Sequence, residues 1–77
     1  INLSITTKVK RGTGISQLSW DGATSSKVDI YRNGSKIKTT ANDGFWRDRI
    51  SGASGNYTYK VCEKGTNNCS AEQTVTF

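Results

Sequence analysis

The chain has 77 residues, with 11 Lys and Arg against 6 Asp and Glu, which gives a formal net charge of +5. This length allows one domain with a thin core, and the absence of His excludes Ser-His and Cys-His nucleophile pairs and argues against a zinc site. No segment has the pattern of a signal peptide or of a membrane span. We therefore expect residues 1–77 to form a single non-catalytic domain without metal or cofactor.

Short alternations of apolar and polar residues recur along the chain, and no window keeps a helical period. Turn-forming residues separate the alternating segments at intervals of about eight to twelve residues, as in β-sandwiches. In chain order, the predicted strands are residues 1–9, 15–20, 28–32, 35–40, 45–50, 56–63 and 69–77. The pattern predicts an all-β fold, a seven-stranded immunoglobulin-like or fibronectin type III-like β-sandwich.

The amino-terminal half begins its alternation at Ile1, so we expect the chain to be one domain of a larger protein. Arg11-Gly12-Thr13-Gly14 predicts a mobile turn, and Leu18 and Trp20 share one face of the strand after it. Between the third and fourth strands, Asn33-Gly34 is a strong hairpin signal, because both central residues of a type I′ turn need a positive φ.

In the carboxy-terminal half, alternation places Trp46, Asp48 and Ile50 on one face of the fifth strand. The sixth strand then turns Tyr57, Tyr59 and Val61 toward the same interior. The predicted core residues are Trp20, Ile30, Trp46, Tyr57 and Val61.

Cys62 and Cys69 enclose six residues, and in a chain of this size we expect them to form a disulfide rather than remain two buried thiols. A disulfide implies an oxidising compartment, hence a secreted protein. Strict alternation turns Cys62 outward and Cys69 inward, whereas a cross-strand disulfide needs both on one face. A β-bulge between Ser70 and Gln73 would reconcile the two positions.

Four features carry a family resemblance. Trp20 resembles the buried tryptophan of fibronectin type III domains, and VDIYRNGSKI (28–37) resembles one of their hairpins. Tyr57, in the run GNYTYKV (55–61), matches their tyrosine-corner position. The tail YKVCEKGTNNCS (59–70) is similar to C-terminal modules of secreted bacterial subtilisin-like serine proteases.

The resemblance implies a non-catalytic accessory domain of a secreted bacterial protease, acting as a spacer or as a substrate-engaging module. Its expected partners are a protein substrate or insoluble polymer and the remainder of its own parent chain. We expect a monomer without membrane contact, and we do not expect nucleic acid as the ligand. The alternatives are a module that binds polysaccharide or another polyanion for an extracellular hydrolase, and a purely structural domain.

The excess positive charge has two interpretations. It can be a solvated surface whose lysines keep edge strands from pairing with other chains. It can also be a binding surface for an anionic polymer, in which clustered cations meet the charges and aromatic rings add stacking. For the second interpretation, the candidate surface residues are Tyr31, Lys36, Lys38, Phe45, Arg47 and Arg49.

Overall fold

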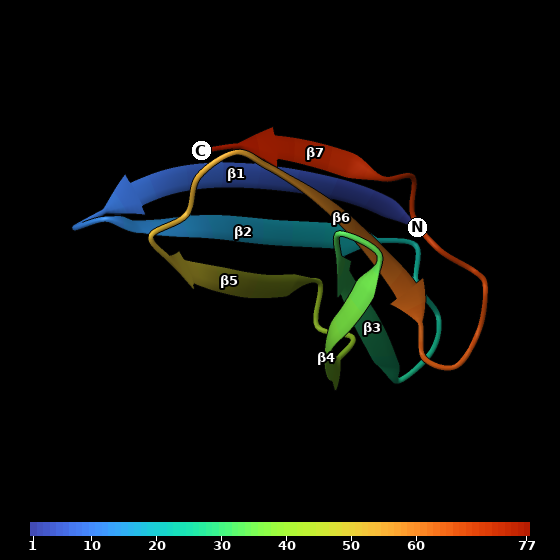
Figure 1. Ribbon diagram of the computed structural model, residues 1–77. Coiled ribbons are helices and arrows are strands. Elements are labelled where there is room, and N and C mark those ends of the chain that lie inside the picture. The colour runs from blue at the N-terminus through green and yellow to red at the C-terminus, as the bar shows by residue number, and fades with distance from the viewer.

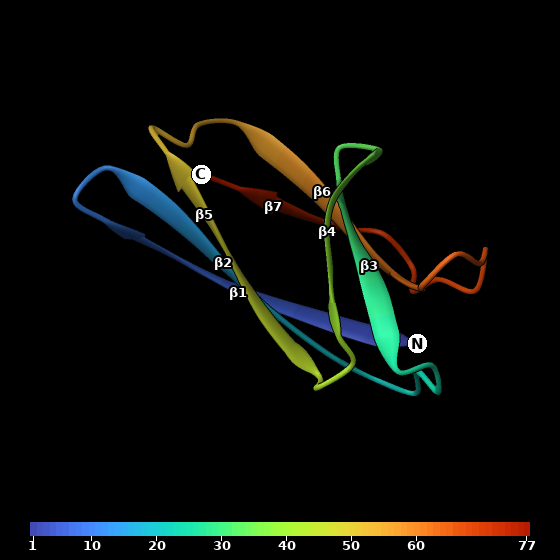
Figure 2. The same cartoon turned by 90° about the horizontal axis from the view of Figure 1, so that it is seen from below.

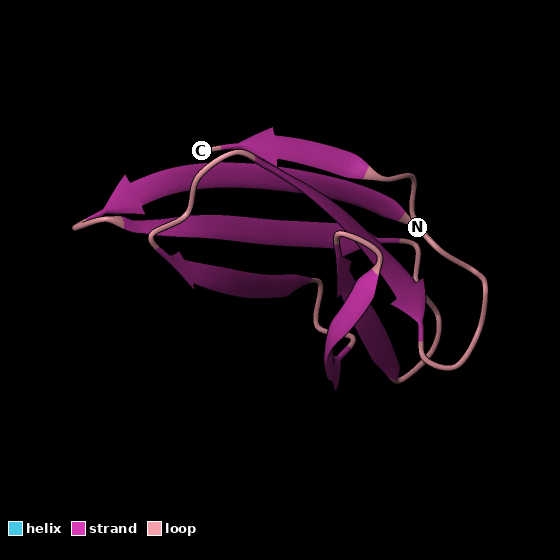
Figure 3. Cartoon of the chain, in the orientation of Figure 1, coloured by secondary structure: helices cyan, strands magenta, loops and turns pink.

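The computed structural model describes all 77 residues, and strands are its only regular elements (Figure 3). The strands are β1 (Asn2–Lys10), β2 (Thr13–Asp21), β3 (Lys27–Arg32), β4 (Ser35–Ala41), β5 (Phe45–Ser51), β6 (Asn56–Glu63) and β7 (Gln73–Thr76). They form two antiparallel sheets, ordered β1-β2-β5 and β4-β3-β6-β7 (Figure 1). The predicted all-β class is confirmed. The structure has no helix of the length and apolarity needed to cross a membrane.

Two tight turns set the hairpins of the two sheets. Asn33 (φ 51°) and Gly34 (φ 82°) connect β3 to β4 as the sequence predicts. Arg11 (φ 53°) and Gly12 (φ 78°) adopt the same left-handed pair, and Lys10 lies opposite Thr13 across them. The turn predicted over residues 11–14 is present but shorter, because two residues with positive φ match the twist of the flanking strands and close the hairpin directly, so that β2 already begins at Thr13.

The core lies between the two sheets. Seven buried side chains form it: Leu3, Leu18, Trp20, Val28, Ile30, Tyr59 and Val61. Of the predicted core, Trp20, Ile30 and Val61 belong to this cluster, whereas Trp46 and Tyr57 are only partly buried and pack against its margin. Tyr57 lies near the start of β6, where its ring meets Phe77 edge-on at 5.8 Å.

The last strand is shorter than the predicted segment 69–77, since β7 covers only Gln73–Thr76. Cys69 forms an isolated bridge opposite Cys62, and the two residues form a disulfide with a Cα–Cα distance of 3.9 Å. From Tyr59 to Cys62 the chain advances three residues, whereas its partner covers four from Gln73 to Cys69. The extra residue confirms the irregularity predicted before Gln73, and it allows both sulfurs to meet on one face.

A hydroxyl group completes the pairing at this irregularity. The backbone N–H of Ser70 donates to the carbonyl of Val61 (2.8 Å), and the N–H of Val61 donates to Ser70 Oγ (3.1 Å). The buried Ser70 side chain thus replaces the carbonyl acceptor that a regular ladder would supply.

One end of the sandwich is closed by the carboxy-terminal residue. Phe77 exchanges two backbone hydrogen bonds with Gly55 (2.9 and 3.1 Å), and its ring packs over Gly14 of β2. A Cβ at Gly14 would lie 2.5 Å from the Cβ of Ala53 and 2.9 Å from the Phe77 ring. Close approach of the chain, rather than backbone conformation, therefore requires glycine here. Beyond this point the turn between β1 and β2 projects furthest from the body (Figures 1 and 2).

Candidate anion-binding face

The six predicted surface residues lie on two different sheets. Phe45, Arg47 and Arg49 belong to β5 at the edge of the three-stranded sheet, whereas Tyr31, Lys36 and Lys38 belong to β3 and β4 of the four-stranded sheet. The structure therefore divides the candidate surface residues into two groups. The β4-to-β5 connection crosses from one sheet to the other, and alternation within each strand could not show that crossing.

The group on the four-stranded sheet is small and partly shielded. Tyr31 is half-buried rather than exposed, and it lies opposite Lys36 on one side and Lys60 on the other. Lys60 Nζ lies 4.9 Å from the centre of the Tyr31 ring. A register shift between Ile30 and Tyr31 leaves Ile37 unpaired. Lys38 therefore lies opposite the buried Ile30 and not beside Tyr31 and Lys36. No pocket is found beside these residues.

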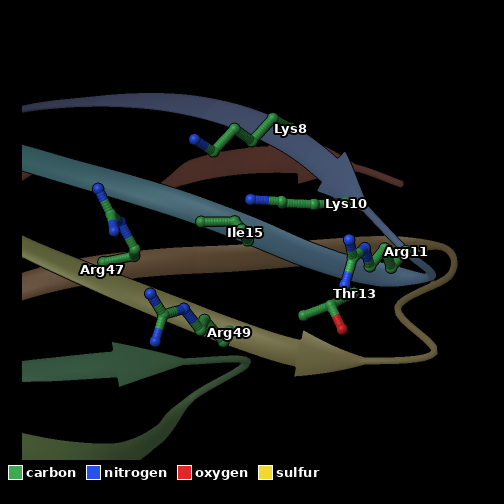
Figure 4. Close-up of a pocket in the computed structure, with 7 residues that line it drawn as sticks. All are labelled: Lys8, Lys10, Arg11, Thr13, Ile15, Arg47 and Arg49. Atoms are coloured by element: carbon green, nitrogen blue, oxygen red, sulfur yellow. The ribbon is translucent and has the colours of Figure 1, made fainter.

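The group on the three-stranded sheet belongs to a larger cluster. An open pocket of about 360 Å³ lies on the outer face of this sheet, and seven residues from β1, β2, β5 and the β1–β2 turn line it (Figure 4). We call this surface the cationic face, and its residues are Lys8, Lys10, Arg11, Thr13, Ile15, Arg47 and Arg49. Five of the seven carry a positive charge, and no acidic residue lines the pocket.

Strand register explains why these side chains meet. Ile15 of β2 lies opposite Lys8 of β1 on one side and opposite Arg49 of β5 on the other. Directly opposite residues of antiparallel strands point to the same side, so the lysine and the arginine flank the isoleucine. Two residues away, the flanking is one-sided: Gln17 has Arg47 on its β5 side only, and Thr13 has Lys10 on its β1 side only. The cations thus form one row on each edge strand, with uncharged β2 residues between them.

The middle of the face is apolar and covered. Ile15 is only 6% exposed although it lies outside the inter-sheet core. Long Lys and Arg side chains bury their aliphatic stems on apolar surface and keep their charged ends in water. We infer that the stems around Ile15 cover it and that their charged ends form the rim of the pocket, as Figure 4 shows.

An aromatic ring stands at one end of the face. Phe45 is 46% exposed, and the Arg47 guanidinium lies over its ring at 5.9 Å from the centroid. This contact orients Arg47 along β5 and leaves much of the ring accessible.

Few acidic side chains are available at the surface to balance the positive charge of the face, because three of the six acidic residues are buried. Asp29, Asp48 and Glu63 are 3%, 6% and 8% exposed. The only salt bridge joins Arg32 to Asp48 (2.7 Å). The remaining ten Lys and Arg side chains lack a salt bridge, and only Asp21, Asp43 and Glu72 are acids at the surface. The net positive charge is thus concentrated on the outside of the molecule.

Glu63 holds the loop between β2 and β3 against the segment that the Cys62–Cys69 disulfide encloses, which we call the disulfide loop. Its Oε1 accepts from the Thr24 N–H (2.7 Å), the Thr24 hydroxyl (2.8 Å) and the Ser25 N–H (2.9 Å), and its Oε2 accepts from the Asn68 amide. These donors stabilise the carboxylate and lower the pKa of Glu63 to about 2, with the Thr24 N–H contributing most.

Asp29 has a similar structural role on the outer side of the four-stranded sheet. The Thr39 hydroxyl donates to its Oδ1 (2.6 Å), and the Gly65 N–H donates to its Oδ2 (3.2 Å). The Thr39 bond is the main cause that holds the pKa of Asp29 below its ordinary value, against the opposing effect of burial. Asp29 and Glu63 therefore anchor the disulfide loop from both sides.

Asp48 joins the two sheets through the interior. Its Oδ2 accepts from the Tyr59 hydroxyl (2.6 Å) and from Arg32 Nη1 (2.7 Å). Burial, together with the hydrogen bond to Asp48, raises the pKa of Tyr59 to about 12. Ser16 lies directly opposite Asp48, and its Oγ is fully buried without a hydrogen-bond partner. The one pocket of the structure lies elsewhere, and this group connects the two sheets.

No model of a known protein family, no curated protein and no solved structure matches this chain. No three His, Cys, Asp or Glu side chains gather closely enough to hold a metal ion. The cationic face is the one pocket of the structure.

Sequence reasoning found Phe45, Arg47 and Arg49 but missed the β1 half of the face. Lys8 and Lys10 have the opposite parity to Leu3 and Ile5, so alternation alone could have placed them outward. The pairing of β2 with β5 is non-local, however, and no turn signal predicts it. Only that pairing brings the lysines of β1 into the same pocket as the arginines of β5.

Proposed function

We propose that this chain is a non-catalytic, fibronectin type III-like module that attaches a secreted parent protein to an anionic polymer through the cationic face. The observation that carries the proposal is the convergence of five cations on one pocket without an acidic neighbour. Clustered cations bind polyanions by displacing the counterions that surround them.

Edge protection alone does not account for this arrangement. Charged side chains on an edge strand oppose pairing with another chain, and this role does not require the charges of two different edges to converge. Here β1 contributes two lysines and β5 two arginines, and both pairs line the same pocket over Ile15. Like charges brought together repel one another, so a cluster of this kind is more readily explained by a ligand of opposite sign.

Two features support the fibronectin type III-like assignment. Trp20 lies in the core between the sheets. The backbone N–H of Ser54 donates to the Tyr57 hydroxyl (3.3 Å), which is the type of contact that a tyrosine corner makes at the start of the sixth strand. The parent we propose, from the sequence resemblance, is a secreted bacterial protease, and the module would hold it on an acidic, polymer-rich substrate.

The Cys62–Cys69 disulfide fits an extracellular location. It lies at the far end of β6 from the tyrosine corner and ties down the loop that carries Gly65 and Asn68. In an oxidising environment the disulfide stays formed, and it therefore keeps this loop where Asp29 and Glu63 accept hydrogen bonds from it.

The test is binding to soluble polyanions as a function of salt. Wild-type protein should bind at low ionic strength, with an affinity that falls steeply as salt rises. Replacing Arg47 and Arg49 with Gln should reduce affinity by about tenfold and lower the slope of log K against log salt by about 1.5. A matched control replaces Lys36 and Lys38 with Gln, which removes the same charge from the other sheet.

The control should change the slope far less, because its lysines lie outside the pocket. The opposite sheet is about 10 Å away, beyond the range at which charges act strongly at physiological salt. No binding at low salt would overturn the proposal. Equal losses in the two variants would also overturn it, since binding would then depend on net charge rather than on the cationic face.

A further inference from the structure

The cationic face has the form of a narrow track. Neighbouring strands lie about 4.8 Å apart, so the lysines of β1 and the arginines of β5 stand on rows about 10 Å apart. Between them β2 offers Thr13, Ile15 and Gln17, none of which is charged or aromatic. A ligand on this face therefore meets cations on both edges at Ile15, on the β1 edge toward the Lys10–Thr13 pair and on the β5 edge toward Phe45, with an uncharged floor beneath it.

The track has a direction and a length. It runs along the strands from the Lys10–Thr13 pair to the Ser19–Phe45 pair. Six residue steps along β2 separate Thr13 from Ser19, which corresponds to about 20 Å. The only acidic residue further along the same side of β2 is Asp21, which accepts a hydrogen bond from Asn2 (2.9 Å). Phe45 therefore marks the end of the positive segment.

The shape of the track argues against nucleic acid. Proteins that bind single-stranded nucleic acid stack successive bases on successive aromatic side chains. The aromatic surface beside this face is the single ring of Phe45, which can stack one base and not a succession of bases. Readout of duplex DNA needs an element that enters a groove, whereas the pocket is lined by side chains on the outer face of a three-stranded sheet.

We propose that the ligand of the cationic face is a single chain of an acidic polysaccharide, bound parallel to the strands. Its sulfate or carboxylate groups contact the lysines of β1 on one edge and the arginines of β5 on the other, over Ile15. One sugar ring at the end of the track packs against the exposed surface of Phe45. This inference rests on the proposed function and names the class of polymer.

The test compares three ligand series of increasing length: heparin oligosaccharides from disaccharide to decasaccharide, oligothymidylates, and short DNA duplexes. Calorimetry at fixed salt gives the affinity of each. Saccharide affinity should rise with length and level off once a chain spans about 20 Å. Both nucleic acid series should bind more weakly at matched charge.

A variant of the aromatic end separates the ring contact from the charge. Phe45→Ala should lower saccharide affinity about fivefold and leave the salt slope unchanged, because it removes apolar contact and no charge. The matched control is Val9→Ala, which truncates a 64%-exposed side chain of β1 whose parity is opposite to that of Lys8 and Lys10, so that it points away from the cationic face. It should have no effect on affinity.

The outcomes separate the two proposals. If DNA of either form binds as tightly as the saccharides, or if Phe45→Ala and Val9→Ala behave alike, the polysaccharide assignment is overturned while polyanion attachment stands. If no series binds at low salt, both proposals fail.

Discussion

The hydroxyl of Tyr59 allows a sharp test of how the two sheets are joined. It is fully buried, and it donates to Asp48 Oδ2 at 2.6 Å. A hydrogen bond to a charged group contributes about 1.5–3 kcal/mol to stability. In Tyr59→Phe the Arg32 contact at 2.7 Å remains, so the carboxylate keeps one partner and the full penalty of an orphaned charge does not apply. We therefore expect a loss of about 2 kcal/mol in the free energy of unfolding, or about 10 °C in Tm.

Urea unfolding followed by tryptophan fluorescence measures this difference. The m-value should stay unchanged, since the substitution alters stability and not the surface exposed on unfolding. Tyr57→Phe is the matched control, because it removes a hydroxyl whose single contact is an exposed 3.3 Å bond from the Ser54 N–H. A Tyr59→Phe variant no less stable than Tyr57→Phe would refute the inter-sheet role of Asp48.

Wild type and Tyr59→Phe should also differ in how their stability depends on alkaline pH. The pKa of Tyr59 is raised from about 10 to about 12 in the folded protein. The stabilisation from the neutral hydroxyl is complete below pH 10 and is lost as the pH rises through 12. Wild type should therefore lose stability over this range more steeply than Tyr59→Phe. If the free energy of unfolding fell equally steeply with alkaline pH in the two proteins, that result would contradict the burial of the hydroxyl.

Three further predictions concern the scaffold. Acid should destabilise the protein between pH 4.5 and about 2, because over this interval Glu63 stays ionised in the folded protein but becomes protonated in the unfolded chain. Glu63→Gln should make the fall in stability over this interval less steep. A fall of unchanged steepness in the variant would contradict this. Gly14→Ala should lower stability by about 1–3 kcal/mol in thermal unfolding, because its Cβ meets the Phe77 ring at 2.9 Å, and a neutral effect would show that the ring does not close this end. Replacing Cys62 and Cys69 with Ser should destabilise the protein by about 2.5 kcal/mol relative to the disulfide-bonded wild type in the loop-entropy account, and the reduced wild type should match the variant.

Several structural details show where prediction from the sequence succeeded locally. The Asn33-Gly34 turn was predictable because the requirement for two positive φ angles is a property of adjacent residues. The disulfide followed from two cysteines in a chain of this size, and the irregularity before Gln73 followed from their parity, since two cysteines on opposite faces cannot bond without an extra residue. Tyr59 was placed on the right face of β6, yet only the packed structure shows that it is more deeply buried than Tyr57.

The sequence by itself determined the strands, most of the turns, the inward and outward alternation and the disulfide, because these depend on neighbouring residues and on a period of two. The tertiary structure alone decided which strands are neighbours. Pairing β2 with β5 brought Lys8 of β1 and Arg49 of β5 to either side of Ile15, and the crossover between β4 and β5 separated Lys36 from Arg47. Non-local pairing is set by packing of the whole core, so the cationic face could not be assembled from any local pattern in the chain.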